Sequence, residues 1–265
     1  MVRFICVLGL SALGIALGGA AWREFLDLPS LLITLGGALG VTFLTYPWAR
    51  LRDLAALLGA VFTAGRPDRE DLARELARLG RLYRLKGARG LEGQEGHIAD
   101  PYLRRGLGLL IDMQSEQDIR AEMEGAFESV AARYRAAGQI LFTLGKLLPT
   151  FGLIGTLIGL VLLLRQMSGS EPEALTASFG LALMTTLYGA LFANVVVLPL
   201  GAKLESAEGE RTALMRAVLE WTLALARGAA PAAVERRLAA LAPAEASDRP
   251  GAKDERPWRP FLWQR

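Results

Sequence analysis

The sequence predicts an all-α membrane protein with four transmembrane helices and a helical cytoplasmic insert, and three observations lead to this fold class. Hydrophobic residues make up 52% of the 265 residues and charged residues 22%, so the two kinds must be segregated along the chain. Four runs without charge are long enough to cross a hydrocarbon core of about 30 Å. Lys and Arg gather on one side of these runs. The runs are residues 4–22, 28–48, 147–164 and 174–202.

Residues 1–48 are predicted to form a hairpin of two spans. The run 4–22 follows Arg3 and ends in small residues, a pattern that also fits a secretory signal peptide. However, only residues 23–27 separate this run from the second one, and its cleavage would leave an odd number of spans. We therefore expect two transmembrane helices joined by a tight turn.

Residues 49–146 are predicted to form the cytoplasmic insert, built of three helices that pack on each other. Leucines at 72, 76, 79, 82 and 85 recur at helical spacing, which predicts an amphipathic helix over 67–85. Asp100 followed by Pro101 is typical of a helix start, and this helix should run to Ile111. A third helix begins near Asp118 and continues without a break into the third span.

Residues 147–202 supply the third and fourth spans, and residues 203–265 form the C-terminal segment. The helix of the fourth span should continue to about Ala226. A short helix over 234–241 and a disordered tail are expected after it, because no sustained apolar face remains. Aromatic residues stand among arginines at 256–265, which fits either a membrane-surface anchor or a frayed terminus.

The distribution of basic residues predicts the orientation. Two short loops carry only Arg23 and Arg165 alongside acidic residues, so they face the periplasm, while both termini and the insert are cytoplasmic. This bias explains the net charge of +3 without a nucleic-acid partner, and the expected location is the bacterial inner membrane. The basic residues on the cytoplasmic side are Arg50, Arg52, Arg133, Arg135, Lys146, Lys203 and Arg211.

The sequence offers no pattern of an enzyme or of a cofactor site. The single cysteine, Cys6, excludes an intrachain disulfide and a cysteine metal cluster. No arrangement of Ser, His and Asp, of Cys and His, or of a phosphate-binding loop is present. We expect a protein that is not an enzyme and that binds neither a cofactor nor a resident metal.

None of the four runs contains Asp, Glu, Lys, Arg or His. Because ion transport requires a titrating or oxygen-rich site in the membrane, a carboxylate would have to come from another chain. The third and fourth spans do offer hydroxyls at Thr156, Thr185 and Thr186, which either line an ion pathway or hydrogen-bond helix backbones. Gly155 and Gly159 have the four-residue spacing that lets helices approach closely.

Two prolines lie at matching depth. Pro149 stands near the start of the third span and Pro199 near the end of the fourth, so in spans of opposite direction both fall at the cytoplasmic mouth. Each removes a backbone hydrogen bond and bends its helix. They are either coupling residues or ordinary helix boundaries.

Four segments resemble a known family. DLPSLLITLGGALGVTFLTYP, DPYLRRGLGLLID, LPTFGLIGTLIGLVLLL and TTLYGALFANVVVLPL are similar to segments of flagellar stator A subunits (MotA/PomA) within the MotA/TolQ/ExbB proton channel family, over residues 1–225. The resemblance implies an ion channel for H+ or Na+ that generates torque. It also implies a pentamer around two copies of a MotB-type partner, whose single span supplies an ion-binding Asp. The family's functional prolines match Pro149 and Pro199.

The resemblance also implies a contact with the rotor protein FliG. The family's Arg and Glu, eight residues apart around a glycine, match Arg84 and Glu92 in RLKGARGLE, with Lys86 and Arg89 as helpers. The stretch before Glu92 is less apolar than in the family, and a charge cluster of this kind can also be a solvated face. Threonines at both Thr156 and Thr186 resemble sodium-driven members, which favours sodium as the coupling ion.

Two alternative functions are weighed against the stator. A TolQ/ExbB-type energiser of envelope machinery would have three spans and a different insert. The other alternative is a self-sufficient transporter or a purely structural membrane scaffold; a transporter should carry its own intramembrane charge or an internal repeat, and the sequence shows neither. The four spans and the DLPSLLITLGG hairpin favour the stator.

Overall fold

The computed structural model describes residues 25–63, 69–167 and 172–228, and these residues are helical without a strand. Three helical segments are long and apolar enough to cross a membrane: Leu28–Thr45, Glu116–Gln166 and Leu175–Ala226. They confirm the second, third and fourth predicted spans. The first predicted span, residues 4–22, lies outside the described residues, as do the predicted helix over 234–241 and the tail.

The chain divides into two compact units. The first comprises residues 1–67 and 121–216, and the second comprises residues 68–120 and 217–265. Helix α7, Glu116–Gln166, is one uninterrupted helix of 51 residues whose first turn belongs to the second unit. It confirms the expected continuity between the insert and the third span.

In the first unit, the second span is built of α2 (Leu28–Leu31), a π-helical stretch η2 (Leu32–Gly36) and α3 (Gly37–Thr45). Asp27 caps this segment, because its carboxylate accepts a hydrogen bond of 2.9 Å from the Ser30 backbone N–H. The segment ends before Pro47, where Tyr46 is extended as expected for a residue preceding proline.

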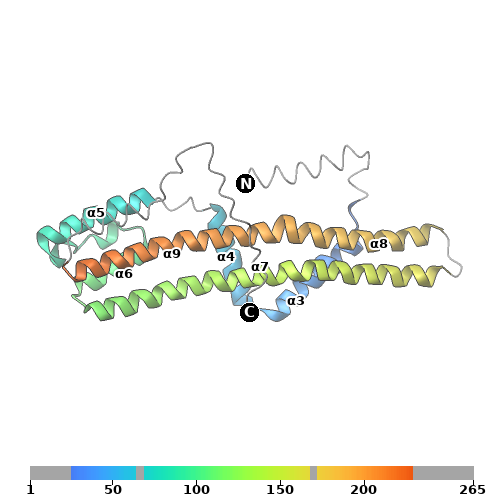
Figure 1. The fold of residues 1–265 in the computed structure, drawn as a ribbon, viewed down its shortest axis with the longest axis horizontal. Helices are drawn as coiled ribbons and strands as arrows, with labels where there is room; N and C mark the ends of the chain where they lie inside the picture. Colours follow the sequence, from blue (N-terminus) through green and yellow to red (C-terminus); the bar gives the residue numbers. More distant parts are fainter. Residues whose placement is uncertain (1–24, 64–68, 168–171, 229–265) are drawn as a thin grey trace, which may run out of the picture. The chain divides into compact units, whose positions relative to one another are not determined.

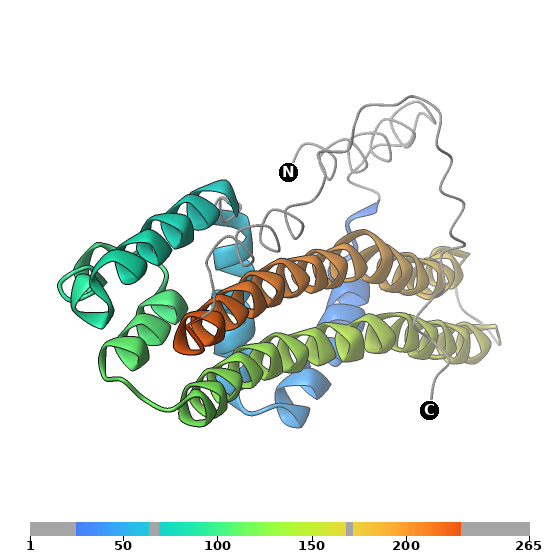
Figure 2. The ribbon, with the colours of Figure 1, turned by 60° about the vertical axis from the view of Figure 1, so that its left-hand side comes forward.

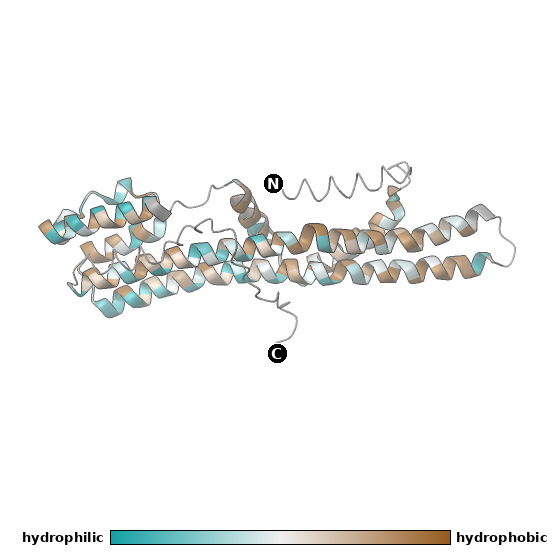
Figure 3. Ribbon diagram, turned by 45° about the horizontal axis from the view of Figure 1, so that its top comes forward, coloured by the Kyte–Doolittle hydropathy of each residue, from teal (hydrophilic) through white to brown (hydrophobic). Residues whose placement is uncertain are grey.

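The fourth span begins with α8 (Pro172–Leu191), widens into a second π-helical stretch, η5 (Phe192–Val197), and continues as α9 (Leu198–Ala226). Within the first unit, α8 and the first part of α9 run alongside α7 (Figures 1 and 2). Figure 3 shows that apolar residues dominate α8 and the neighbouring part of α7, as expected for segments surrounded by hydrocarbon. The end of α9 at Ala226 confirms the predicted continuation.

Helix α4, Trp48–Thr63, was not predicted as a separate element. It crosses the direction of α7 in Figures 1 and 2. Asp53 forms an ion pair of 3.4 Å with Arg133 of α7, and the Lys203 ammonium lies 3.6 Å from the centre of the Phe62 ring. The apolar side of α4 covers a buried core: Leu54, Leu57, Leu58 and Val61 pack against Ala38, Ala137, Leu141, Leu148, Ala193, Val197 and Leu204.

The second unit contains the short helices of the insert. These are α5 (Arg69–Lys86), the 3₁₀ turns η3 (Ala88–Gly90) and η4 (Glu95–His97), and α6 (Pro101–Ile111). The Asp100 carboxylate accepts hydrogen bonds from the backbone N–H groups of Tyr102 and Leu103, at 2.8 and 3.2 Å, which confirms the predicted start of α6.

The predicted apolar stripe of α5 is correct except at its end. Leu76 and Leu79 are fully buried, but Leu85 is 81% exposed. The chain turns at Gly87, whose positive φ of 64° suits glycine, and folds back so that Leu91 and Ile98 fill the core instead. The last turn of α5 is therefore free to present its side chains to solvent.

Candidate functional site

The third and fourth spans meet along a line of glycines. A methyl group on Gly155 would lie 2.5 Å from the Thr185 hydroxyl oxygen and closer still to the Thr185 Cβ. A methyl group on Gly152 would lie 2.9 Å from the Thr185 carbonyl oxygen, and one on Gly159 would lie 2.8 Å from the Ala182 Cβ. Only glycine fits at these positions, which confirms the predicted close approach at Gly155 and Gly159.

The three candidate threonines occupy different environments around this contact. Thr185 is fully buried, and its hydroxyl donates to the Leu181 and Ala182 carbonyls at 3.0 Å each. Thr156 is half-exposed and Thr186 is exposed. Because Thr156 follows Gly155 and Thr186 follows Thr185, both flank the point where the two helices touch.

The hydroxyls of Thr156 and Thr186 donate to carbonyls of their own helices. Thr156 donates to Leu153 at 2.6 Å and Thr186 to Ala182 at 3.4 Å. A hydroxyl oxygen that donates its hydrogen keeps lone pairs that can accept a hydrogen bond or bind a cation. The geometry thus allows both the backbone role and the ion-pathway role that the sequence left open.

Pro149 and Pro199 are both exposed, but their helices respond differently. Pro149 lies inside α7, which stays α-helical around it. Pro199 follows the π-helical stretch η5, which ends at Val197. A proline has no backbone N–H to donate to the helical hydrogen bonds, and its ring crowds the carbonyl group four residues earlier. Local widening of the helix is one way to relieve this crowding and the missing hydrogen bond.

A set of polar contacts between the second and fourth spans was missed in the sequence. The Ser30 hydroxyl donates to the Asp27 carboxylate and also lies 3.4 Å from the Leu181 carbonyl oxygen, and the Thr34 hydroxyl donates to the Thr185 carbonyl at 3.3 Å. The Tyr188 hydroxyl accepts from the Asp27 backbone N–H at 2.8 Å and donates to the Phe25 carbonyl. Hydroxyls inside an apolar run were the available signal, since they must find partners there.

The candidate rotor-contact residues lie together at the end of α5 and in the following turns. Arg84 and Lys86 belong to the last turn of α5, Arg89 to η3, and Glu92 follows η3. All four are exposed, and none forms an ion pair with another described residue. Their charges are therefore available to a partner. The exposed Leu85 lies between Arg84 and Lys86.

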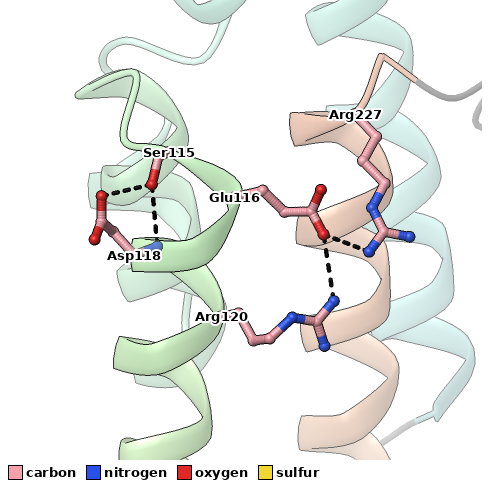
Figure 4. Close-up of polar contacts among 5 residues, drawn as sticks. All are labelled: Ser115, Glu116, Asp118, Arg120 and Arg227. Atoms are coloured by element: carbon pink, nitrogen blue, oxygen red, sulfur yellow. Dashed lines mark hydrogen bonds and ion pairs between the residues drawn. The ribbon is translucent and has the colours of Figure 1, made fainter.

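A second charged group in the same unit has a structural role. Figure 4 shows that Glu116 at the start of α7 binds both Arg120, at 3.3 Å, and Arg227 just after α9. The hydrogen bond from Arg227 holds the pKa of Glu116 below its ordinary value, and the same contact raises the pKa of Arg227. Ser115 caps α7 beside them by accepting from the Asp118 backbone N–H at 3.2 Å.

We expect Arg227→Gln to loosen the end of α9, with faster amide hydrogen exchange over residues 217–228. The contact should be at full strength above the ordinary pKa of Glu116, because that pKa is lowered in the folded chain, and should be lost as the pH falls through the lowered value. The difference between variant and native protein should be present at about pH 7 and vanish in acid. A difference that does not change with pH would contradict this role for Glu116. Arg74→Gln, which removes a solvent-exposed ion pair to Asp71, is the control.

The comparisons with known proteins agree with this architecture. The model of the MotA/TolQ/ExbB proton channel family matches residues 94–217. Motility protein A of Borreliella burgdorferi is 30% identical over 214 residues, which cover 81% of this chain and 82% of that protein. The uncharacterised protein YtxD of Bacillus subtilis is 31% identical over 221 residues, which cover 83% of this chain and 80% of that protein. The C. jejuni MotAB structure matches with a TM-score of 0.83 at 22% identity, over 96% of this chain and 98% of that one.

The chain therefore belongs to the MotA/TolQ/ExbB proton channel family, and it is a multi-pass protein of the inner membrane. Within that family it is a stator subunit of the motility protein A type, which confirms the predicted function. This assignment is favoured over a TolQ/ExbB-type energiser of envelope machinery. The similar proteins named above match most of the chain, and they include a motility protein.

Proposed function

We propose that this stator subunit forms, together with a MotB-type single-span partner, an ion channel that converts an H+ or Na+ gradient into torque on the rotor. The observation that carries the proposal is the absence of Asp, Glu, Lys, Arg and His from the four apolar runs. A cation must pass a site that binds it, so the carboxylate comes from the partner and this chain supplies neutral oxygens. The MotAB complexes among the structural matches support assembly with a MotB-type partner.

The proposed assembly is a pentamer that encloses two partner helices, with both termini and the insert in the cytoplasm. Apolar side chains on the outer faces of α7 and α8, such as Leu157 and Leu187, are exposed in the single chain and available to neighbouring copies, the partner or lipid. The basic residues flanking the spans support the orientation. Co-purification of a tagged chain with a single-span partner tests the assembly, and recovery of the chain alone would contradict it.

We propose sodium as the coupling ion, with Thr156, Thr185 and Thr186 along its pathway. Sodium needs several hard oxygen ligands to replace its hydration shell, whereas a proton needs only the carboxylate. Because Thr156 is half-exposed and Thr186 is exposed, whereas Thr185 is buried, the first two are the proposed ligands and Thr185 supports them.

Swimming speed should therefore depend on external sodium at fixed pH, and Thr156→Ala or Thr186→Ala should weaken that dependence. Thr45→Val, which removes an exposed hydroxyl at the end of α3, serves as the control and should leave it unchanged. The decisive measurement replaces sodium by potassium. An unchanged speed that a protonophore abolishes would identify the proton as the driver and return both threonines to a packing role.

We further propose that Arg84 and Glu92, with Lys86 and Arg89, contact the rotor protein FliG. Exposed charges steer a partner at long range and contribute little to folding, so charge reversal should act on torque alone. We expect Arg84→Glu and Glu92→Lys each to reduce motility strongly while the protein level and ion flux stay normal. Arg81→Glu, at an exposed position one turn earlier in α5, is the matched control. Normal swimming of both variants would place the contact elsewhere.

A further inference from the structure

Two large apolar side chains are exposed among the described residues of the second unit, Leu85 and Met113. They are 81% and 82% exposed, whereas apolar residues of the neighbouring helices such as Leu79 and Leu107 are fully buried. A single exposed apolar side chain is ordinary on a protein surface. Exposure alone therefore assigns neither residue a role.

Met113 holds a backbone conformation that does not suit its side chain. Its φ is 51°, in the left-handed region that favours glycine. It lies in the turn after α6, where its N–H donates to the Leu110 carbonyl at 3.3 Å and the Gln114 N–H donates to the Leu109 carbonyl at 3.2 Å. This pair of bonds forms a Schellman motif, in which glycine is the usual residue at the place of Met113. The exposed side chain strains the turn without packing inside the chain, which points to a contact outside it.

The turn that contains Met113 lies beside the end of α5, as both Figures 1 and 2 show. Contacts within the unit agree with this placement. A methyl group on Gly108 would lie 3.8 Å from a carboxylate oxygen of Glu95, and the Gly108 carbonyl accepts from the Asp112 N–H at 2.9 Å. Met113 therefore borders the surface formed by the candidate rotor-contact residues, which also contains Leu85.

The chemistry of this surface favours a protein partner over lipid. Helix α7 begins at Glu116, and about 45 Å of helix separates this residue from Leu147, where the third apolar run begins. The membrane is thus too distant to cover Met113. The candidate rotor-contact residues around Leu85 are three cations and one carboxylate, all exposed, so the surface attracts an acidic partner. An apolar centre with a charged rim is the common anatomy of a protein interface.

We propose that Leu85 and Met113 form the apolar centre of the rotor contact, and that they pack against an apolar side chain of the rotor protein that acidic residues surround. The proposal rests on the rotor contact proposed above. In this arrangement the charges steer the rotor protein into place, and the burial of the two apolar side chains holds it while force is transmitted.

Met113→Gly is the decisive variant, because glycine adopts a φ of 51° without strain and the turn is kept while the side chain is lost. The purified stator complex should keep or raise its temperature of thermal inactivation, whereas its affinity for the purified rotor protein should fall roughly tenfold. Leu85→Ser should lower that affinity by a similar factor without a loss of stability, since Leu85 packs little within the chain. The torque of tethered cells should fall with the affinity.

Two further variants separate this role from a structural one. Met113→Leu keeps an apolar side chain at the strained position and should retain native affinity and torque. Gln117→Ala, at an exposed position in the first turn of α7, is the matched control and should change neither. A photo-crosslinking amino acid in place of Met113 should capture the rotor protein in cells.

Native affinity and torque in both Met113→Gly and Leu85→Ser, together with a loss of both in Arg84→Glu, would overturn the proposal and leave the rotor contact standing. Native behaviour of all three variants would overturn the rotor contact as well. Crosslinking of position 113 to a second copy of the chain would place Met113 between stator subunits and would also refute its role at the rotor.

Discussion

Replacing Gly155 by alanine should abolish or severely reduce motility. The added methyl group would overlap the Thr185 side chain, which is fully buried and cannot move aside. Alanine favours a helix over glycine by about 1 kcal/mol, but overpacking a close contact costs about 1–3 kcal/mol, so the balance is unfavourable. Separation of α7 from α8 would also displace Thr156 and Thr186 from each other.

Gly180→Ala is the matched control, because it makes the same substitution in α8 where nothing lies within 4 Å of the added atom. We expect Gly180→Ala to swim normally and to be as stable as the native protein or slightly more so. Swimming in soft agar and the thermal inactivation of the purified complex measure both effects. Equal behaviour of the two variants would show that the α7–α8 contact is not tight in the assembled stator.

Replacing Pro199 by alanine should give stators that assemble but produce little torque. Alanine can donate the missing hydrogen bond, which allows η5 to return to α-helical geometry. A π-helical stretch holds an extra residue in its turn, so its loss would rotate α8 relative to α9 by about 100°. Thr186 of α8 would then no longer keep its native orientation relative to α9.

Pro149→Ala is the informative comparison, since α7 contains no π-helical stretch around Pro149. It restores a backbone N–H donor without changing the helical register, and we expect a weaker loss of torque. Torque is measured on tethered cells. Amide hydrogen exchange over residues 190–200 reports whether η5 has become α-helical. Native torque in both variants would show that the prolines are only boundary residues.

The spans and the start of α6 were predictable because each depends on neighbouring residues. Charge-free length defines a span, and Asp100 with Pro101 defines a helix start, whatever the rest of the chain does. Helix α4 was not predicted, because it follows Pro47 directly and its apolar side is specified by packing against α7 and α9. The exposure of Leu85 depends on the turn at Gly87, which the leucine spacing does not reveal.

The candidate site was predictable in composition but not in arrangement. Thr156, Thr185 and Thr186 could be selected as hydroxyls inside spans, yet their burial depends on which face of α8 meets Gly155. The π-helical stretches have no sequence signature in this chain beyond the proline that follows η5.

The hydroxyl contacts between the second and fourth spans set an order of events during synthesis. Ser30 and Thr34 each bind a carbonyl that lies 151 residues later in the chain. At about 5–20 residues per second, a ribosome reaches that carbonyl on the order of ten seconds after the second span has emerged. Until then the hydroxyls of Ser30 and Thr34 have no fourth span to bind. A chain that stops before α8 therefore leaves the Thr34 hydroxyl without its carbonyl partner, whereas the Ser30 hydroxyl keeps the Asp27 carboxylate as a partner within its own segment.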